Sequence, residues 1–357
     1  MSTTPKNDAL GPIFYGPMEA KDIPKVFPRD SIFVPALYKG QDVDVLKNLG
    51  LTFLLADFTN RKSGPRRFLK EGVVSTDRTM IVMFCDIKGS TAALEHLRQK
   101  IFRELQDDFF TACTATVMEV NKNRTEHDSR AVIDKYMGDS AMIYIDVGDT
   151  ERSDDASKQA NFAAKKSEGT EKAVKITRSI TTKIVELDKK YAPSLSGFRL
   201  GARFGIAMGD RVILSVLGCR FESGVLSQVG DFTLTGSVVN LAARLEHATP
   251  AEFVECIAQS RREIESYTSL VWERDRLRTT KLGEALLSID RQVTELYEIC
   301  KMNFEIRADS HFVTQYESGK GEKMPWKVVP FSPRGFPGRQ RALLLGGNSV
   351  ADLLRRI

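Results

Sequence analysis

The chain has 357 residues, of which 28% are charged and 42% hydrophobic, and its formal net charge is +5. This composition is typical of a globular protein, and the length allows one large domain with extensions or two domains. Acidic residues nearly balance the basic ones, so the charge does not by itself favour nucleic acid or membrane binding. No apolar run approaches the ~20 residues that a membrane-spanning helix needs.

The cysteines and the N-terminus bear on the compartment. An odd number of cysteines without a CxxC pair argues against a disulfide framework and against a zinc ribbon. The first residues lack the apolar core of a signal peptide. We therefore expect a cytoplasmic protein without a membrane span. The five cysteines are Cys85, Cys113, Cys219, Cys256 and Cys300.

Prolines recur through the first 40 residues, between scattered aromatic residues. Each proline removes a backbone donor and disfavours a regular helix, so we expect an extended arm there. Apolar residues at three- and four-residue steps then predict a helix over residues 42–58, and a basic linker over residues 61–67 ends it. Residues 1–76 are assigned to an N-terminal arm and helix.

The first acidic strand is predicted over residues 79–86. Its apolar run ends at Asp86, close to Gly89, so one carboxylate is expected at the end of a buried strand. Apolar residues from Leu94 to Val117 then recur at three- and four-residue steps, which predicts one long helix. Ser90 or Thr91 is expected to cap it.

A second acidic element is predicted as a hairpin over residues 132–144, turning at Gly138 and Asp139. A polar stretch over residues 149–170 follows, and then an amphipathic helix through residues 173–187. Two carboxylates at the ends of neighbouring strands suit a hard cation such as Mg²⁺ or Mn²⁺. A single Gly-Asp step is as easily explained by a β-turn.

The second half of the chain begins with glycine-punctuated β segments over residues 198–218. A short helix over residues 236–248 carries Asn240 and Arg244 one turn apart. Further strands are expected near Phe253 and over residues 270–273 and 295–299, with a helix near Arg261. The order predicts an α+β fold of the ferredoxin-like βαββαβ type, with an additional αβ pair and helices packed on a mixed sheet. Residues 306–357 are assigned to a C-terminal tail.

Four motifs in sequence order add specificity to this pattern. The chain resembles the catalytic domain of the class III nucleotidyl (adenylate/guanylate) cyclases over about residues 77–305. The motifs are residues 84–91 (FCDIKGST), 135–139 (KYMGD), 203–209 (RFGIAMG) and 231–246 (DFTLTGSVVNLAARLE).

The resemblance implies a two-metal active site that forms a 3′,5′-cyclic nucleotide and pyrophosphate. Asp86, Asp139 and the carbonyl of Ile87 match the family's ligands for two divalent ions, Mg²⁺ or Mn²⁺. Arg244 matches the arginine that stabilises the transition state on the α-phosphate, and Asn240 matches the asparagine that orients the ribose.

The residues that match the family's base-reading pair are Lys135 and Thr233, and this pair favours ATP over GTP. If Asp210 is an insertion, Arg211 falls on the family's phosphate-contacting arginine. The late lysine that binds the triphosphate has no clean match. Lys281 and Arg278 are the weak candidates for it.

In the resembled family, the metal-binding aspartates of one chain meet the base-reading, asparagine and arginine residues of another. One catalytic segment in this chain therefore implies a homodimer with two equivalent sites. The product would be read by an unknown cyclic-nucleotide effector. No nucleic acid partner is implied.

Other functions stay open at this point. Ser215 in place of a glycine, a long loop over residues 218–231 and the lack of a recognisable sensor module fit a pyrimidine cyclase. Such an enzyme would make cUMP or cCMP in Pycsar anti-phage defence. A catalytically inactive, nucleotide-binding module is a second alternative, although the chain keeps both aspartates, Asn240 and Arg244. A polymerase-like or diguanylate-forming enzyme is a third, and the helix with Asn240 and Arg244 argues against it.

Overall fold

The computed structural model describes most of the chain beyond residue 72. The expected helix over residues 42–58, Arg211 and the chain end from residue 348 lie outside the described residues. Contacts divide the chain into two compact units, which are described separately. The described residues are 36–37, 73–76, 78–122, 129–149, 156–195, 197–210, 212–217, 220–222, 225–228, 230–271, 276–320, 324–333, 336 and 340–347. Unit 1 comprises Met1–Val82, Arg103–Ile180 and Gly209–Asn240, and unit 2 comprises Met83–Phe102, Thr181–Met208 and Leu241–Ile357.

The α+β class and the βαββαβ order are confirmed. The larger sheet has seven strands in the order β12-β13-β11-β6-β3-β5-β4, and parallel and antiparallel pairs both occur in it. The elements that form the βαββαβ unit are β3 (Arg78–Lys88), α5 (Ser90–His96), α6 (Gln99–Asn121), β4 (Arg130–Met137), β5 (Ser140–Asp149), α7 (Ala156–Tyr191) and β6 (Gly201–Gly209).

The single helix expected after Gly89 is wrong, because α5 and α6 are separate helices. Leu97 has extended backbone angles (φ −83°, ψ 141°), and its N–H bonds the carbonyl of Ala93. Gly89 itself is the N-cap of α5 with φ 92°, and no side chain caps that end, so the expected cap by Ser90 or Thr91 is also wrong. Leu94 is 49% exposed. The buried face of α6 is as predicted, with Leu105, Phe109, Cys113 and Val117 all buried.

Helix α7 begins earlier than expected, because residues 156–170 are helical rather than an irregular polar stretch. Lysine, alanine and glutamate have high helix propensity, so this segment continues the helix without an apolar face of its own. Farther along, Ile176, Ile180 and Ile184 are fully buried, as predicted. The 3₁₀ turn Ala192–Ser194 ends the helical region.

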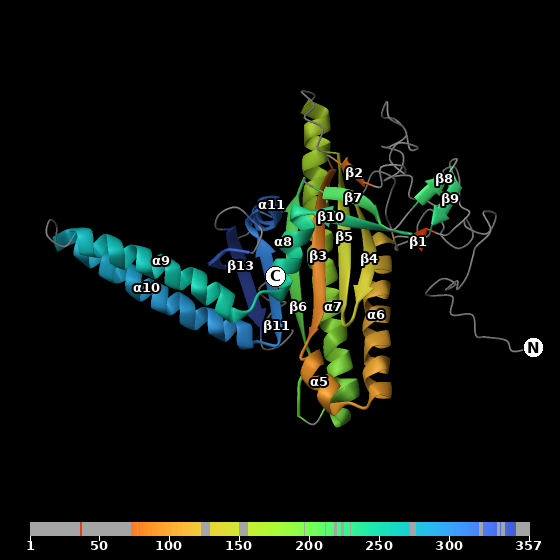
Figure 1. Ribbon diagram of the computed structural model, residues 1–357, viewed down its shortest axis with the longest axis horizontal. Helices are drawn as coiled ribbons and strands as arrows, with labels where there is room; N and C mark the ends of the chain where they lie inside the picture. The colour runs from red at the N-terminus through yellow and green to blue at the C-terminus, as the bar shows by residue number, and fades with distance from the viewer. Residues whose placement is uncertain are drawn as a thin grey trace, which may run out of the picture. The chain divides into compact units, whose positions relative to one another are not determined.

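In unit 1 the β4–β5 hairpin lies along α6 (Figure 1). The hydroxyl of Tyr136 on β4 lies 2.7 Å from Thr114 Oγ1 and donates to the carbonyl of Phe110 at 3.0 Å. Thr116 Oγ1 and Ser179 Oγ, 2.9 Å apart, join α6 to α7. The helices are thus tied to the hairpin and to each other by polar contacts as well as by apolar packing.

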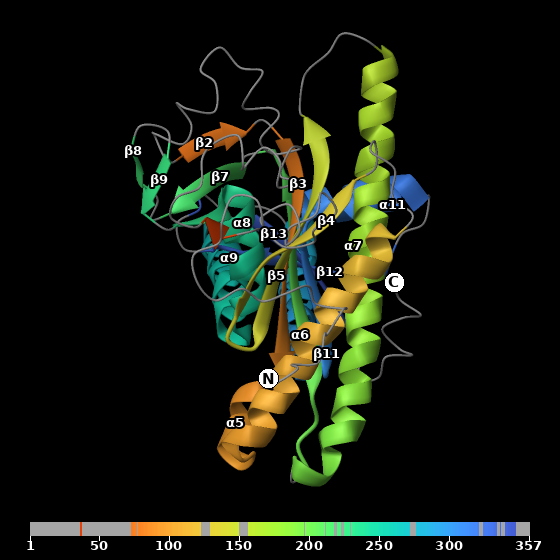
Figure 2. The ribbon, with the colours of Figure 1, turned by 90° about the vertical axis from the view of Figure 1, so that its right-hand side faces the viewer.

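A second, smaller sheet also belongs to unit 1. Its strand order is β1-β10-β7-β2, and a separate two-stranded ribbon lies beside it in Figure 2. The strands are β1 (Ala36–Leu37), β2 (Val73–Thr76), β7 (Val212–Leu217) and β10 (Gly230–Gly236), with β8 (Arg220–Glu222) and β9 (Val225–Gln228) in the ribbon.

In unit 2, α9 (Pro250–Val271) and α10 (Arg276–Lys301) form a helical hairpin (Figure 1). The strands expected near Phe253 and over residues 295–299 are therefore wrong, and residues 270–271 of the strand expected over residues 270–273 are helical instead. Phe253 and Ile257 lie one helical turn apart and share a buried cluster with Leu296 and Ile299. Short apolar runs fit a strand or a buried helix equally well, and the tertiary packing selects the helix here.

Helix α8 (Ser237–His247) precedes this hairpin and agrees with the predicted bounds. After the hairpin come β11 (Phe304–Asp309), α11 (Ser310–Lys320), β12 (Lys327–Phe331) and β13 (Gln340–Gly347). β11 pairs parallel with β6 and antiparallel with β13. The segment assigned to a tail thus contributes strands to the sheet, while the domain boundaries at residues 76 and 305 stay predictions.

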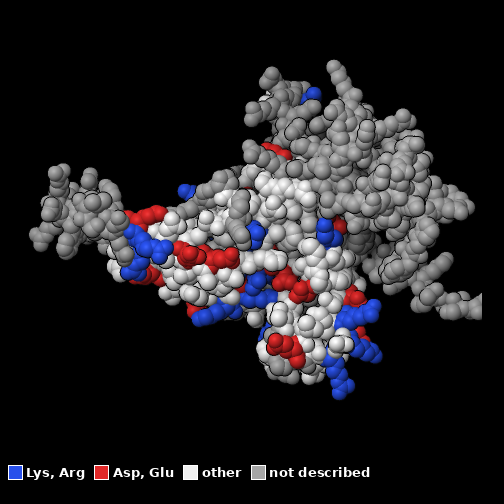
Figure 3. All heavy atoms as spheres, in the orientation of Figure 1, with Lys and Arg blue, Asp and Glu red and all other residues white. Residues whose placement is uncertain are grey.

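The surface of the α9–α10 hairpin carries charges of both signs (Figure 3). Arg261 and Asp290 form an exposed ion pair between the two helices at 2.5 Å. None of the helices in the described part of the chain combines the length and the apolar composition of a membrane-spanning segment.

Candidate active site

The first predicted metal ligands lie near the end of β3. Asp86 is half-buried, and Ile87 is buried with only 1% of its surface exposed. Lys88 donates hydrogen bonds to the carbonyls of Cys300 (2.6 Å) and Met302 (2.5 Å) and also pairs with Glu305. The strand end next to Asp86 is thereby tied to the end of α10 and to β11.

A buried ionic cluster continues from Glu305. The Arg307 guanidinium contacts the Glu305 carboxylate at 2.6 Å, and both side chains are almost fully buried. Burial lowers the pKa of Lys88, although its contact with Glu305 acts in the opposite direction. The Arg203 guanidinium is a third cation, with Nε 3.9 Å from Glu305 Oε2. A buried carboxylate needs such compensation in the low-dielectric interior.

Arg307 also caps helix α8, which carries Arg244. Its Nη1 donates to the carbonyls of Leu245 (3.1 Å), Glu246 (3.2 Å) and Ala248 (2.5 Å). These carbonyls have no partner within the helix, and the guanidinium also complements the negative end of the helix dipole. Arg307 therefore fixes the C-terminal end of α8.

Asn240 and Arg244 are both exposed and lie one turn apart on α8. The helix packs directly on β6: a Cβ atom added at Gly205 would lie 2.2 Å from the carbonyl oxygen of Ala242 and 2.5 Å from the nitrogen of Glu246. The glycine of the RFGIAMG motif thus permits the close approach of the helix that carries Arg244.

The end of α8 also contains a titratable group that the sequence did not indicate. His247 contacts the carboxylate of Glu246, and this hydrogen bond raises the pKa of His247 above its usual value. Burial opposes the shift, while the negative charge of Asp86 adds to it. His247 is thus electrostatically coupled to the predicted metal ligand on β3.

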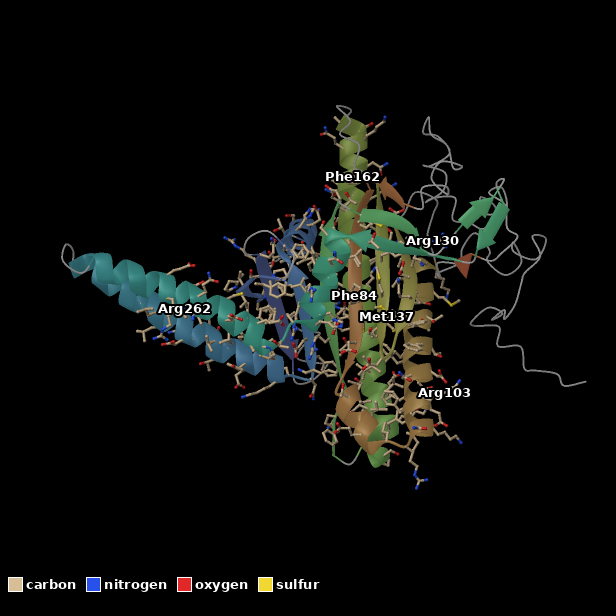
Figure 4. All side chains as sticks on the ribbon, in the orientation of Figure 1. Phe84, Arg103, Arg130, Met137, Phe162 and Arg262 are labelled. Carbon is tan, nitrogen blue, oxygen red and sulfur yellow. The ribbon has the colours of Figure 1, made fainter. Side chains whose placement is uncertain are left out.

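In unit 1, Asp139 lies in the turn between β4 and β5 and is half-buried. Gly138 has φ +63°, a left-handed conformation that suits glycine. Gln106 on α6 donates to the carbonyl of Gly138 at 2.9 Å, and Ser140 Oγ donates to that of Met137 at 2.9 Å. The turn that presents Asp139 is therefore held from both sides. Figure 4 labels Met137 beside this turn.

The predicted base-reading residues both lie in unit 1. The Lys135 side chain is 39% exposed, and its Nζ lies 3.3 Å from Oδ2 of the buried Asp134. Oδ1 of Asp134 accepts a hydrogen bond from the N–H of Leu234 at 3.3 Å. Thr233 is the preceding residue on β10, where it pairs with Ser215 of β7.

The predicted site residues divide between the two units. Asp86, Ile87 and Arg244 belong to unit 2, and Lys135, Asp139, Thr233 and Asn240 belong to unit 1. Lys281 and Arg278 lie on helix α10. Within the described part of the chain, no group of three or more His, Cys, Asp or Glu side chains could hold a metal.

Several residues of this region were missed from the sequence. Glu305 and Arg307 alternate with Phe304, Ile306 and Ala308, a pattern that usually marks a strand with one solvated face. All six residues of β11 are buried instead. Asp134 gives no sequence signal beyond its position before Lys135.

No family model matches the chain. An adenylate cyclase from Anabaena cylindrica is 29% identical over 182 residues, which is 51% of this chain and 29% of that protein. The chain thus spans less than a third of the length of this relative.

Solved cyclase structures are also similar. The adenylyl cyclase CyaB from P. aeruginosa matches with 15% identity and a TM-score of 0.43, covering 77% of this chain and 96% of that one. An adenylate/guanylate cyclase/hydrolase from Silicibacter pomeroyi matches with 11% identity and a TM-score of 0.40, covering 77% and 99%. The resemblance carried by the four motifs is confirmed in the sequence: over about half of its length, this chain is similar to an adenylate cyclase.

Proposed function

We propose that the chain is a nucleotide cyclase that converts a nucleoside triphosphate to a 3′,5′-cyclic nucleotide and pyrophosphate. The observation that carries the proposal is the exposed Asn240–Arg244 pair on α8, whose end is capped by the buried Arg307. A guanidinium and an amide on the accessible face of a helix whose end is fixed suit a reaction that needs positioning and charge stabilisation.

In this reaction the ribose 3′-oxygen forms a bond to the α-phosphorus. The bond between that phosphorus and the oxygen bridging to the β-phosphate breaks, and pyrophosphate leaves with the electron pair. The proton of the 3′-hydroxyl passes to solvent. Arg244 would stabilise the charge that develops on the α-phosphate, and its planar guanidinium can contact two oxygens at once. Asn240 would orient the ribose.

The carboxylates of Asp86 and Asp139 and the carbonyl of Ile87 would hold two divalent ions. All three donors are oxygens, which fits Mg²⁺ or Mn²⁺, and both carboxylates are half-buried and so reachable. The ions would supply a lower pKa for the 3′-hydroxyl and a clamp on the phosphates. Lys135 and Thr233 would bind the base, and Arg211 would contact phosphate.

The substrate is proposed to be ATP. The Lys135–Thr233 pair and the adenylate cyclase from Anabaena cylindrica both support this choice. A uridylate or cytidylate cyclase of a Pycsar anti-phage system is the competing substrate class. We further propose that the enzyme works as a cytoplasmic homodimer, in which Asp86 and Asp139 of one copy meet Lys135, Thr233, Asn240 and Arg244 of the other.

The test is to incubate the purified protein with each of the four nucleoside triphosphates and Mn²⁺ and to identify the product by mass spectrometry. Cyclic AMP with pyrophosphate is the expected result. Arg244→Ala is expected to lower kcat by about 10²–10³, the usual cost of removing a transition-state charge donor. Arg262→Ala, at an exposed arginine of α9 labelled in Figure 4, is the matched control. No cyclic product from any nucleotide would refute the proposal.

A further inference from the structure

Asp134 is a buried acidic residue that the proposed reaction does not use. Its side chain has no exposed surface. It lies in β4 where the pairing with β5 shifts register between Ile133 and Lys135. Such a bulge re-aims a side chain that regular pairing would direct elsewhere. A buried carboxylate is costly unless it is compensated, so its contacts define its role.

The two carboxylate oxygens of Asp134 contact different segments of unit 1. Oδ1 accepts from the backbone N–H of Leu234, 100 residues farther along the chain, at 3.3 Å. Oδ2 lies 3.3 Å from Nζ of Lys135. The same side chain thus joins the strand that carries Lys135 to the strand that carries Thr233.

Lys135 remains able to bind a ligand while it is held in this way. Its side chain is 39% exposed, although its partner is fully buried. An ammonium group has three donors, so it can contact Asp134 and acceptor atoms on the edge of a base at the same time. Restraining a long side chain before the ligand arrives lowers the entropy that binding would otherwise lose.

The contact with Leu234 acts on the other half of the pair. Thr233 pairs with Ser215 in β7, and its neighbour Leu234 is bound by Asp134, so the β10 backbone is held at two adjacent residues. The Asp134 carboxylate therefore sets the spacing between Lys135 and the backbone of Thr233.

We propose that Asp134 is a positioning residue for base selection. It holds Lys135 and the β10 backbone at Thr233 in place, so that the two residues bind the nucleobase together. This inference rests on the proposed nucleotide cyclase function. It assigns to Asp134 an effect on the choice of base and on substrate affinity, with little effect on the chemical step.

Asp134→Asn separates the two contacts. The amide keeps an oxygen that can accept from Leu234, but it loses the negative charge that faces Lys135. The matched control is Asp146→Asn: Asp146 is also buried, lies on β5 of the same hairpin and accepts from the N–H of Gly148 at 3.1 Å. This hydrogen bond involves neither Lys135 nor β10.

The experiment measures kcat and KM for all four nucleoside triphosphates with Mn²⁺, in the full-length wild type and both variants. For Asp134→Asn, KM for the preferred nucleotide is expected to rise about tenfold, with kcat changed by less than about threefold. The reason is that Lys135 loses the charge-assisted contact with Asp134 that restrains it before the nucleotide binds. Base preference is expected to fall by a similar factor. Asp146→Asn is expected to keep the wild-type preference. In a Lys135→Ala background, Asp134→Asn should add nothing.

If the wild type makes a cyclic product but Asp134→Asn leaves the base preference unchanged, the role of Asp134 is overturned and the proposed cyclase function is not. If kcat/KM falls equally for all four nucleotides, and Asp146→Asn lowers it by the same factor, the role of Asp134 is merely structural. If the wild type forms no product, the affinity for each nucleotide in the presence of Ca²⁺ is measured by calorimetry and tests the role of Asp134 instead. A base preference in binding that Asp134→Asn weakens would support the inference, and an absence of nucleotide binding would overturn it.

Discussion

The guanidinium of Arg307 lies 2.6 Å from the carboxylate of Glu305, two residues away on the same buried strand. Arg307 also donates to three carbonyls at the end of α8, and Lys88 pairs with Glu305 from the end of β3. Within unit 2, the strand that carries Asp86 and the helix that carries Arg244 therefore share one buried ionic cluster. Its removal should affect stability and activity together.

Arg307→Ala is expected to destabilise the protein by about 3–5 kcal/mol, because it leaves part of a buried charge uncompensated. Urea unfolding followed by circular dichroism measures this loss. Arg261→Ala is the control, since Arg261 and Asp290 form an exposed pair that contributes at most about 1 kcal/mol. Similar losses in the two variants would contradict the buried cluster as a major source of stability.

Gly205→Ala is expected to displace α8 and lower kcat by at least about tenfold. The new Cβ would lie 2.2 Å from a backbone oxygen of Ala242, and a backbone atom of a packed helix cannot move away cheaply. Gly197→Ala is a useful contrast. Nothing lies within 4 Å of its added Cβ, but φ is +89°. It should therefore cost about 1 kcal/mol of stability with no loss of kcat. Wild-type kcat in Gly205→Ala would argue against the tight contact.

Asp309 predicts a pH dependence of stability. Burial raises the pKa of Asp309 to about 6, although hydrogen bonds from the N–H groups of Phe312 and Met208 act in the opposite direction. The folded state therefore binds this proton more tightly than the unfolded state. The contribution to stability is complete below pH ~4 and is lost as the pH rises through 6.

Asp309→Asn keeps an acceptor for both N–H groups and removes the titration. Between pH 5 and pH 7, the wild type is expected to lose about 1 kcal/mol more stability than the variant. Urea unfolding at the two pH values tests this. Parallel pH profiles for the two proteins would show that Asp309 does not titrate with a raised pKa.

The proposed homodimer predicts complementation. Asp86→Ala and Arg244→Ala should each be nearly inactive, because every site in either homodimer lacks one essential group. After mixing and subunit exchange, half of the dimers would be mixed, and each mixed dimer would keep one intact site. Activity should then recover to about a quarter of the wild-type value. Asp86→Ala mixed with Asp139→Ala should stay inactive, because both changes affect the same half of the site. Recovery in that control would contradict the proposed arrangement.

Local sequence patterns correctly predicted the elements that have a continuous apolar periodicity or characteristic turn residues. The apolar run into Asp86, the hairpin at Gly138 and Asp139, and the short helix with Asn240 and Arg244 all lie where the sequence placed them. Their periodicity and turn residues act over a few positions, so one sequence suffices to detect them. The strands expected near Phe253 and over residues 295–299 failed, because short apolar runs do not distinguish a strand from a buried helix.

By itself, the sequence determined the α+β order and the residue types that favour cyclase chemistry. Only the tertiary structure decided which charged groups are buried and what they hold. Asp134 at a bulge, and Glu305 with Arg307 on a fully buried strand, look like ordinary polar positions in the sequence. Leu234 lies 100 residues from Asp134, and Ala248 lies 59 residues from Arg307, so no local pattern encodes these two contacts. Burial turns these side chains into supports for Lys135 and for α8, because a charge removed from water must find its partners within the fold.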